Sequence, residues 1–345
     1  MTKGELDSRL RLSSYDYQLP AELIAQEPIE PRDAARLLVL HRATGSIEHR
    51  FMRDLPLLLN PGDLIVANRS RVLQARLFGK KLPSGGRVEM TLLRPIEGET
   101  WEALIKGHRL QAGQQVELDN GTRAEIGEPT RGGRTVHFPG TDVYSLLEEA
   151  GQTPLPPYIH GYRGDPRRYQ TVYAEDLGSA AAPTAGLHFT PDLLSRLGER
   201  GIGWASVVLH IGLDTFKPIT EENVPQHHIH TEWLAVSEEV VQAVQRTRET
   251  GGRVTAVGTS SVRSLEFAAR PSGLRAYRGP VDLFVVPGHE FQVVDALLTN
   301  FHMPRTSVLL LVAAFAGREQ ILSAYEEAKR EGYRFLSFGD GMLIL

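Results

Sequence analysis

The stretch RVTAVGTSSVRSLEFAAR (residues 253–270) contains the signals that decide the fold. RVTAVGT (253–259) is typical of a short buried strand, and SVRSLEFAAR (261–270) is typical of a helix. The helix follows the strand after a tight Gly-Thr-Ser-Ser turn. A strand that leads into a helix is the repeating unit of α/β proteins, so this stretch predicts a sheet covered by helices.

The same alternation extends from about residue 180 to the C-terminus. We expect further strands over 203–210, 281–288 and 334–340, and helices over 192–201, 237–252, 306–317 and 318–332. Near the N-terminus we expect a short helix over 19–29, a hairpin over 36–52 and a buried strand over 62–68 that join the same unit. This spacing of strands and helices predicts a mostly parallel sheet.

A different pattern fills residues 71 to 139. Short alternating runs such as RVEMTLL, TWEALIK and RAEIGE are separated by turn signals such as Asn120-Gly121. Regular short strands without a helix predict a small β-barrel or sandwich. We therefore expect a discontinuous α/β domain, 1–70 and 153–345, with an all-β domain, 71–152, inserted into it.

Composition excludes several classes of protein. The 345 residues are 41% hydrophobic and 23% charged, as in ordinary globular proteins. The chain has no cysteine, which excludes disulfides, thiolate catalysis and Cys-ligated metal sites. The N-terminus is too polar for a signal peptide, and the apolar run 307–317 is too short to cross a bilayer. We expect a cytoplasmic monomer with no membrane partner.

Polar residues follow several of the predicted strands, where ligands bind in open α/β sheets. These loops are HIGLDTF (210–216), GTSSVR (258–263), PGHEF (287–291), TNFH (299–302) and SFGDG (337–341). GTSSVR opens a helix, and the free amides of a helix N-terminus favour an anion. AAPTAGLHFT (181–190) adds a Gly- and Pro-rich loop that carries His188 before another helix start.

Two further stretches leave their function open. In HHIHTEW (227–233), a strand would place His228, His230 and Glu232 on one face, with spacing suited to metal ligands or to a polar, proton-transferring cluster. YRGDPRRYQTVY (162–173) mixes arginines with tyrosines, a composition that suits binding of single-stranded nucleic acid. A solvated loop can have the same composition. A metal-dependent hydrolase or oxygenase and a non-catalytic RNA-binding module are therefore alternatives to the function considered next.

Six long motifs resemble the S-adenosylmethionine:tRNA ribosyltransferase-isomerase family of queuosine biosynthesis. They are YDYQLPAELIAQEPIEPRDAARLLVL, APTAGLHFT, LHIGLDTFKPI, AVGTSSVRSLE, LLTNFHMPRTSVLLLVAAFAG and YRFLSFGDGMLIL, in order from about Ser14 to Leu345. The resemblance implies a barrel-like mixed α/β main domain with an inserted small β-barrel. It also implies transfer and isomerisation of the ribosyl part of S-adenosylmethionine onto 7-aminomethyl-7-deazaguanine at the tRNA wobble position. Epoxyqueuosine in tRNA, adenine and methionine would be the products.

The resemblance implies no metal and no cofactor, because S-adenosylmethionine is consumed. The chemistry requires groups that titrate near neutrality, and the expected catalytic residues are His188, His210, His230, His302 and Glu232. His188 is expected to face the reacting ribose. The expected cosubstrate-binding residues are Thr184, Gly186, Phe189, Thr215, Phe216, Thr259, Ser260, Arg263, Asn300 and Asp340. The expected tRNA-binding residues are Arg71, Arg163, Arg167, Arg168 and Tyr169.

Some positions depart from the family pattern. Arg69 stands where the family usually has a carboxylate, so no role is assigned to it. Asp214 and His289 also replace other residues of the family pattern, which argues against a catalytic role for either.

Overall fold

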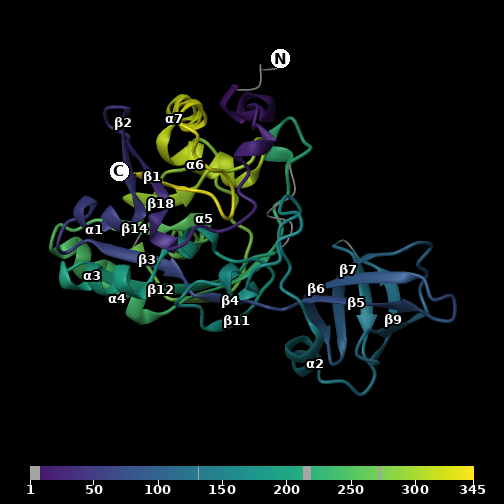
Figure 1. Ribbon diagram of the computed structural model, residues 1–345. Helices are drawn as coiled ribbons and strands as arrows, with labels where there is room; N and C mark the ends of the chain where they lie inside the picture. Colours follow the sequence, from purple (N-terminus) through teal and green to yellow (C-terminus); the bar gives the residue numbers. More distant parts are fainter. Residues whose placement is uncertain (1–7, 131, 213–218, 271–272) are drawn as a thin grey trace, which may run out of the picture. The chain divides into compact units, whose positions relative to one another are not determined.

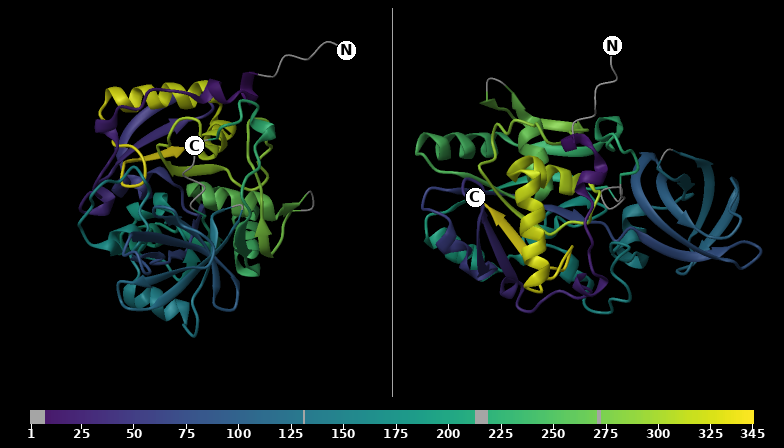
Figure 2. Two further views of the ribbon diagram at one scale, coloured as in Figure 1. Left: turned by 90° about the vertical axis from the view of Figure 1, so that its right-hand side faces the viewer. Right: turned by 90° about the horizontal axis from the view of Figure 1, so that it is seen from above.

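The computed structural model describes residues 8–130, 132–212, 219–270 and 273–345 (Figures 1 and 2). The chain forms two compact units. The larger one comprises Met1–Arg71, Pro156–Asp176 and Ala182–Leu345, and the smaller one comprises Val72–Leu155 and Leu177–Ala181. The expected fold class, a mixed α/β main domain with a closed β-barrel, is confirmed.

The larger unit is built on a nine-stranded sheet of order β17-β13-β12-β3-β14-β18-β19-β1-β2. In chain order, its strands are β1 (Arg36–His41), β2 (Ser46–Phe51), β3 (Leu64–Asn68), β12 (Gly203–His210), β13 (Glu232–Val236), β14 (Val254–Val257), β17 (Tyr277–Val281), β18 (Ala296–Asn300) and β19 (Gly341–Ile344). Its helices are α1 (Leu55–Leu58), α3 (Pro191–Glu199), α4 (Glu238–Glu249), α5 (Gly258–Ala268), α6 (Ser307–Ala316) and α7 (Arg318–Arg330). Two short strands, β15 (Ala269–Arg270) and β16 (Gly273–Leu274), form a separate pair.

The sheet is mixed, so the expectation of a mostly parallel sheet was wrong. Strands β12, β3, β14 and β18 run parallel to one another, as do β1 and β19. Strands β13, β17 and β2 each pair antiparallel with a neighbour, and β19 runs antiparallel to β18. The alternation of strands and helices could not reveal these reversals, because it does not specify which strands become neighbours.

Three element boundaries also differ from the expectations. Residues 19–29 form only a 3₁₀ turn, Ala21–Leu23, because the chain then becomes extended and pairs with Phe335 through an isolated β-bridge at Ile24. The strand expected over 281–288 is instead β17, which ends at Val281. The last strand begins at Gly341, because Leu336 has a φ of 70° and the backbone of 334–340 turns sharply there. The helices over 192–201, 237–252, 306–317 and 318–332 and the hairpin are confirmed.

Strands of the larger sheet are buried on both faces. In β1, Leu37 and Val39 join a core cluster with Leu193 and Leu197 of α3, while the intervening Leu38 and Leu40 are also buried. Helix α5 packs against β3, β12, β14 and β18. Burial on both faces explains why these strands consist of continuous apolar runs.

Asp63 joins the beginnings of three parallel strands. Its carboxylate accepts hydrogen bonds from the Arg253 backbone N–H at 2.8 Å and from Arg253 Nη2 at 3.0 Å, just before β14. Its carbonyl accepts the Gly203 N–H, at the start of β12, at 2.8 Å. Asp63 is only 2% exposed and directly precedes β3. It therefore helps to fix the register of β3, β12 and β14.

The smaller unit is a closed antiparallel barrel of order β10-β7-β6-β5-β8-β9. Its elements are β5 (Arg76–Lys81), β6 (Arg87–Glu97), β7 (Thr100–Lys106), β8 (Gln114–Leu118), β9 (Arg123–Pro129), β10 (Arg134–His137) and α2 (Val143–Ala150). Its core includes Trp101, Val116, Ile126 and Phe138. Strands β4 (Ser70–Val72) and β11 (Asp176–Ser179) pair where the chain passes between the units.

Among the described residues, no single helix is long and apolar enough to cross a membrane, and the pair formed by α6 and α7, which together meet that test of length and composition, is bent by 111°.

Replacing Leu343 by Ala should lower the free energy of unfolding of the larger unit by about 2–5 kcal/mol. Leu343 lies in β19, is fully buried, and belongs to the same core cluster as Leu37 and Leu298. Urea denaturation monitored by tryptophan fluorescence measures the change. The matched control is Leu57→Ala, because Leu57 is 69% exposed and its truncation should change stability by less than about 0.5 kcal/mol. Equal effects of the two variants would contradict the assignment of this core.

Candidate active site

A cavity lies at the edge of the sheet where parallel strands β12, β14 and β18 end. Its volume is about 330 Å³. Residues that directly follow these strands line it, including Gly212, Gly258 and Phe301. Strand β13 runs antiparallel to β12 and therefore begins at the same edge, with Glu232. The cavity thus lies where ligands bind in open α/β sheets.

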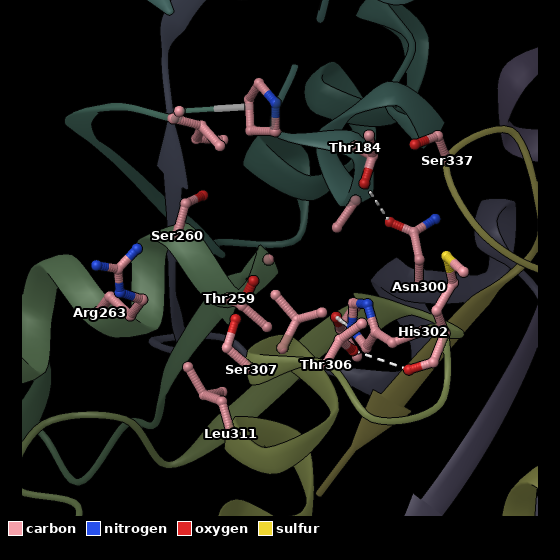
Figure 3. A pocket seen from close by; sticks show the side chains of 18 of the residues that line it. Thr184, Thr259, Ser260, Arg263, Asn300, His302, Thr306, Ser307, Leu311 and Ser337 are labelled. Carbon is pink, nitrogen blue, oxygen red and sulfur yellow. Dashed lines mark hydrogen bonds between the residues drawn. The ribbon is translucent and has the colours of Figure 1, made fainter. Parts of the chain in front are cut away.

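The cavity brings together eight of the predicted site residues from distant parts of the sequence (Figure 3). They are Thr184, His230, Glu232, Thr259, Ser260, Arg263, Asn300 and His302. In this view Arg263 and Ser260 lie toward one end, and Asn300, Thr184 and Ser337 lie toward the other. The lining is largely apolar with a few polar groups, which is typical of small-molecule sites.

The N-terminus of α5 forms part of the wall. Gly258 has a φ of +79°, which a residue with a side chain would adopt only with strain. The hydroxyls of Ser261 and Ser264 donate to the carbonyls of Val257 and Ser260 within the helix. Thr259 and Ser260 line the cavity beside the first turn of α5, where backbone N–H groups favour an anion.

Glu232 and Arg263 form a buried ion pair in the cavity wall. Arg263 Nη1 donates to Glu232 Oε2, and Arg263 Nε donates to the Leu283 carbonyl at 3.1 Å. Glu232 Oε1 accepts the Gly212 N–H at 2.9 Å. Arg263 Nη2 has no hydrogen-bond partner within the described part of the chain. The pair holds both charges in fixed positions at the end of the cavity near α5.

Asn300 connects the cavity to His188. The Thr184 hydroxyl donates to Asn300 Oδ1 at 2.9 Å, and Asn300 Nδ2 donates to His188 Nε2 at 3.3 Å. Burial, with Arg334 and Arg32 nearby, lowers the pKa of His188 to about 4. A neutral imidazole can accept a hydrogen bond from the Asn300 amide. The hydrogen bonds to Thr184 and His188 together fix the orientation of that amide.

His188 does not line the cavity, so the expectation that it faces the reacting ribose was wrong. It lies behind Asn300 and lines a separate cavity of about 20 Å³ with Arg32, Arg168 and Phe338. The Gly- and Pro-rich loop turns Thr184 toward the main cavity and His188 away from it, because residues 184–188 form a 3₁₀ helix.

His302 lies in the cavity wall as a neutral group. Its Nε2 is 2.9 Å from the Thr299 hydroxyl, and its backbone N–H donates to the Tyr325 hydroxyl at 3.0 Å. Burial lowers the pKa of His302 to about 4. It can therefore position a ligand through hydrogen bonds but is a weak base.

Four further predicted residues lie outside the cavity lining. Phe189 is fully buried and packs edge-on against Trp204, so it cannot present its face to a sulfonium. Gly186 is required by packing, since a Cβ there would lie 2.0 Å from the Tyr173 hydroxyl. His210 stacks on Trp233 at 5.4 Å, and burial lowers its pKa.

Asp340 is the fourth. Its carboxylate accepts the backbone N–H groups of Arg36 at 2.9 Å and Arg334 at 2.8 Å, and it is 2% exposed. These bonds hold the turn before β19, and burial raises the pKa of Asp340. The role of Asp340 in this structure is to fix the backbone. The predicted Thr215 and Phe216, together with Asp214, lie outside the described residues.

The strand that would place His228, His230 and Glu232 of HHIHTEW on one face does not form, because β13 begins only at Glu232. His230 and Glu232 line the cavity, whereas His228 is exposed and does not. No group of three or more His, Asp or Glu side chains suited to a metal ion occurs among residues 8–130, 132–212, 219–270 and 273–345.

Comparison with known proteins assigns the family. Residues 12–344 match the family described as queuosine biosynthesis protein. The chain belongs to this family. The chain is 52% identical over 345 residues to the S-adenosylmethionine:tRNA ribosyltransferase-isomerase of Heliobacterium modesticaldum, with 97% of this chain and 100% of the relative covered. It is 50% identical over 341 residues to the protein of the same name from Symbiobacterium thermophilum, with the same coverage.

A solved structure of the family is also similar. It is the crystal structure of S-adenosylmethionine tRNA ribosyltransferase from Thermotoga maritima, with a TM-score of 0.57 and 40% identity. The match covers 96% of this chain and 100% of that chain. The resemblance inferred from the six motifs is therefore confirmed, and this family member shares the fold of its relative.

The residues expected to bind tRNA have different environments in this family member. Arg71 and Arg163 are exposed. Arg167 is exposed and pairs with Asp165 at 2.8 Å, while Arg168 pairs with Glu30 and donates to the Ile29 carbonyl at 2.7 Å. Tyr169 is fully buried against Phe338, so its expected stacking on a tRNA base was wrong for this conformation.

Sequence reasoning missed several residues that line the cavity, among them Tyr158, His227, Phe284, Thr306 and Ser337. The Tyr158 and Ser337 hydroxyls are 2.7 Å apart, and burial raises the pKa of Tyr158 to about 12. A signal existed for Tyr158, since the proline-rich loop that contains it has a composition suited to contact with a substrate. For Phe284, the apolar run around it indicated only a buried strand.

Acid should destabilise the fold of this family member between about pH 6.5 and pH 4. The pKa of His188 is 6.5 in the unfolded chain and about 4 when folded, so the unfolded state binds more protons in this interval. Stability is complete above the unfolded pKa and falls as the pH decreases toward the folded one, by up to roughly 3 kcal/mol for His188. His302 acts in the same direction.

Urea denaturation at a series of pH values measures this effect. His188→Gln, which keeps an acceptor for Asn300 but does not titrate, should reduce the pH dependence of the unfolding free energy. His228→Gln is the control, because His228 is exposed and should leave the dependence unchanged. An unchanged slope in His188→Gln would contradict burial of a neutral His188.

Proposed function

We propose that this chain transfers and isomerises the ribosyl part of S-adenosylmethionine onto 7-aminomethyl-7-deazaguanine at the wobble position of tRNA. The products would be epoxyqueuosine in tRNA, adenine and methionine. The observation that carries the proposal is the convergence of several separate sequence segments on one cavity at the carboxyl ends of parallel strands. The names of the relatives support the same activity.

The reaction places specific demands on the site. Hydrogens on the ribose carbon beside the sulfonium are acidic, because the positive sulfur stabilises a carbanion, and a base must remove one. The attacking amine must be neutral, and adenine must be protonated as it leaves. A largely apolar cavity with a few fixed polar groups suits this chemistry, because electrostatic interactions are stronger where water is excluded.

Polar groups at the two ends of the cavity can bind different parts of the cosubstrate. Thr259, Ser260 and Arg263 lie at the N-terminus of α5 and suit the carboxylate of the methionine part. Thr184 and Asn300, joined by their hydrogen bond, offer oxygen and nitrogen atoms to ribose hydroxyls. His230 and Glu232 also line the cavity, Glu232 as the first residue of β13. A cytoplasmic location, a monomeric state and the absence of a cofactor stay predictions.

The decisive experiment incubates the purified protein with S-adenosylmethionine and tRNA that carries the aminomethyl base, and measures released adenine. We expect adenine in proportion to modified tRNA, and none with tRNA that has guanine at the wobble position. Binding of both substrates without adenine release would contradict the proposal and favour a non-catalytic RNA-binding protein. A requirement for a stoichiometric transition metal would favour the metal-dependent alternative.

Replacing Arg263 by Gln should weaken S-adenosylmethionine binding about 10- to 100-fold, because a charge-assisted hydrogen bond to its carboxylate is lost. Isothermal titration calorimetry measures the affinity. The single change leaves Glu232 buried without its partner. The double variant Glu232→Gln, Arg263→Gln should therefore be measured in parallel. The affinity for tRNA should be unchanged. Equal cosubstrate affinity in the wild type and both variants would move the carboxylate site elsewhere.

Replacing Arg163 and Arg167 together by Ala should weaken tRNA binding and flatten its salt dependence. Each lost phosphate contact removes roughly 0.7–0.9 from the slope of log affinity against log salt concentration, so the slope should change by about one to two units. Arg168 is left intact because it is tied to Glu30 and Ile29. Arg330→Ala, an exposed position on α7, is the control. An unchanged slope in the double variant would indicate that these arginines are hydrated by solvent and do not contact tRNA phosphates.

A further inference from the structure

One histidine of the cavity wall is held by a carboxylate that is not itself part of the cavity lining. His227 lines the cavity, and its Nδ1 lies 2.9 Å from Glu221 Oε2. An ionised carboxylate can only accept, so Nδ1 carries the proton and Nε2 carries the lone pair. The bond to Glu221 uses Nδ1, so Nε2 is the ring atom that can accept a proton.

The charge of Glu221 suits it to support a proton acceptor. Its hydrogen bond to His227 is the largest cause that lowers the pKa of Glu221, to about 2, so this carboxylate is ionised at neutral pH. An ionised partner stabilises the imidazolium that forms when Nε2 takes up a proton. His227 is partly exposed, at 21% of its side chain, so a proton held on it can exchange with solvent.

Three of the histidines considered for catalysis, His302, His188 and His210, have less suitable surroundings. His302 is a weak base, and its Nε2 contacts Thr299. His188 accepts a hydrogen bond from Asn300 and lies outside the cavity lining, as does His210. A base needs a lone pair that faces the substrate and a partner that orients the ring. His227 has such a partner in Glu221 and lines the cavity in which the substrate would lie.

The surroundings of His227 also suit a sulfonium. Its ring meets that of Phe284 edge-on, with ring centroids 5.5 Å apart, and Phe284 is a partly exposed residue of the cavity lining. The face of an aromatic ring attracts a cation. A sulfonium placed against Phe284 would bring the acidic carbon bonded to sulfur near His227.

We propose that His227, oriented by Glu221, is the general base that removes a proton from the ribose carbon bonded to sulfur in S-adenosylmethionine; this assignment rests on the function proposed above. The C–H bond breaks, its electron pair stays on carbon beside the positive sulfur, and the proton bonds to His227 Nε2. The resulting imidazolium, paired with Glu221, then gives this proton to the departing adenine. The bond between ribose and adenine breaks, and its electron pair leaves with adenine. His227 is then neutral again.

The test uses the full chain, S-adenosylmethionine and tRNA that carries the aminomethyl base. His227→Gln should lower kcat for adenine release by about 100- to 10,000-fold, while calorimetry shows S-adenosylmethionine affinity within about threefold of wild type. His228→Gln, the exposed neighbour, should behave as wild type. Circular dichroism and a melting curve confirm that each variant is folded.

A second readout follows the proton itself. In deuterium oxide, the wild type should exchange hydrogen for deuterium at the ribose carbon bonded to sulfur, or show a primary isotope effect with cosubstrate deuterated there. His227→Gln should lose the exchange. Exchange at the wild-type rate in folded His227→Gln would overturn the assignment, whatever its effect on adenine release.

The exchange rate separates orientation from bulk structure. Glu221→Gln should lower kcat and slow the hydrogen exchange at the ribose carbon, with S-adenosylmethionine affinity within about threefold of wild type, because an amide does not stabilise the imidazolium. The other titratable or charged groups on the cavity wall, His230, Glu232, Arg263, His302 and Tyr158, are unchanged in this variant. Exchange at the wild-type rate in folded Glu221→Gln would overturn the role of Glu221.

Failure of this assignment and failure of the proposed function are distinguishable. If the wild type releases adenine and His227→Gln does so at a rate within about threefold, the base is another residue and the proposed function stands. If the wild type binds both substrates and never releases adenine, the proposed function falls and the assignment of His227 falls with it.

Discussion

The position of the site depends on the hydrogen bonds of Asp63, which align the beginnings of three parallel strands. A single buried carboxylate and its carbonyl join the beginnings of β3, β12 and β14. Parallel strands that start together run toward the same edge of the sheet. The loops after β12 and β14 therefore meet at one edge, and β18, which pairs with β14, adds the loop that carries Asn300 and His302. The antiparallel β13 contributes its first residue, Glu232, at the same edge.

Much of this arrangement is predictable from sequence, and the reasons for the exceptions are physical. Strand ends followed by polar residues correctly indicated Thr259, Ser260, Arg263, Asn300 and His302. The same reasoning could not tell whether a side chain in an irregular loop faces a cavity or the core. Thr184 and His188 lie within one 3₁₀ turn, yet only Thr184 lines the cavity. His227 was missed because its role depends on contact with Glu221 and on the cavity, neither of which has a local signature.

The fold was predictable to a similar degree. Continuous apolar runs indicated buried strands, and short alternating runs indicated the barrel. The direction of each strand in the larger sheet depends on which elements become neighbours, so the reversals at β13, β17 and β19 were not predictable from spacing. The end of β17 was misplaced for another reason: residues 281–288 are apolar enough for a strand, but this segment forms part of the cavity wall, with Phe284 and Val285 in its lining.

The buried pair of Glu232 and Arg263 has a consequence for the timing of desolvation. Removing two charges from water is unfavourable, and here that penalty is met when the chain folds, with each charge balanced by the other. An arriving ligand therefore meets groups that are already dehydrated and oriented, and water around them does not have to reorganise during each turnover. The site is preorganised in this respect, because the Glu232–Arg263 pair is in place before a ligand arrives.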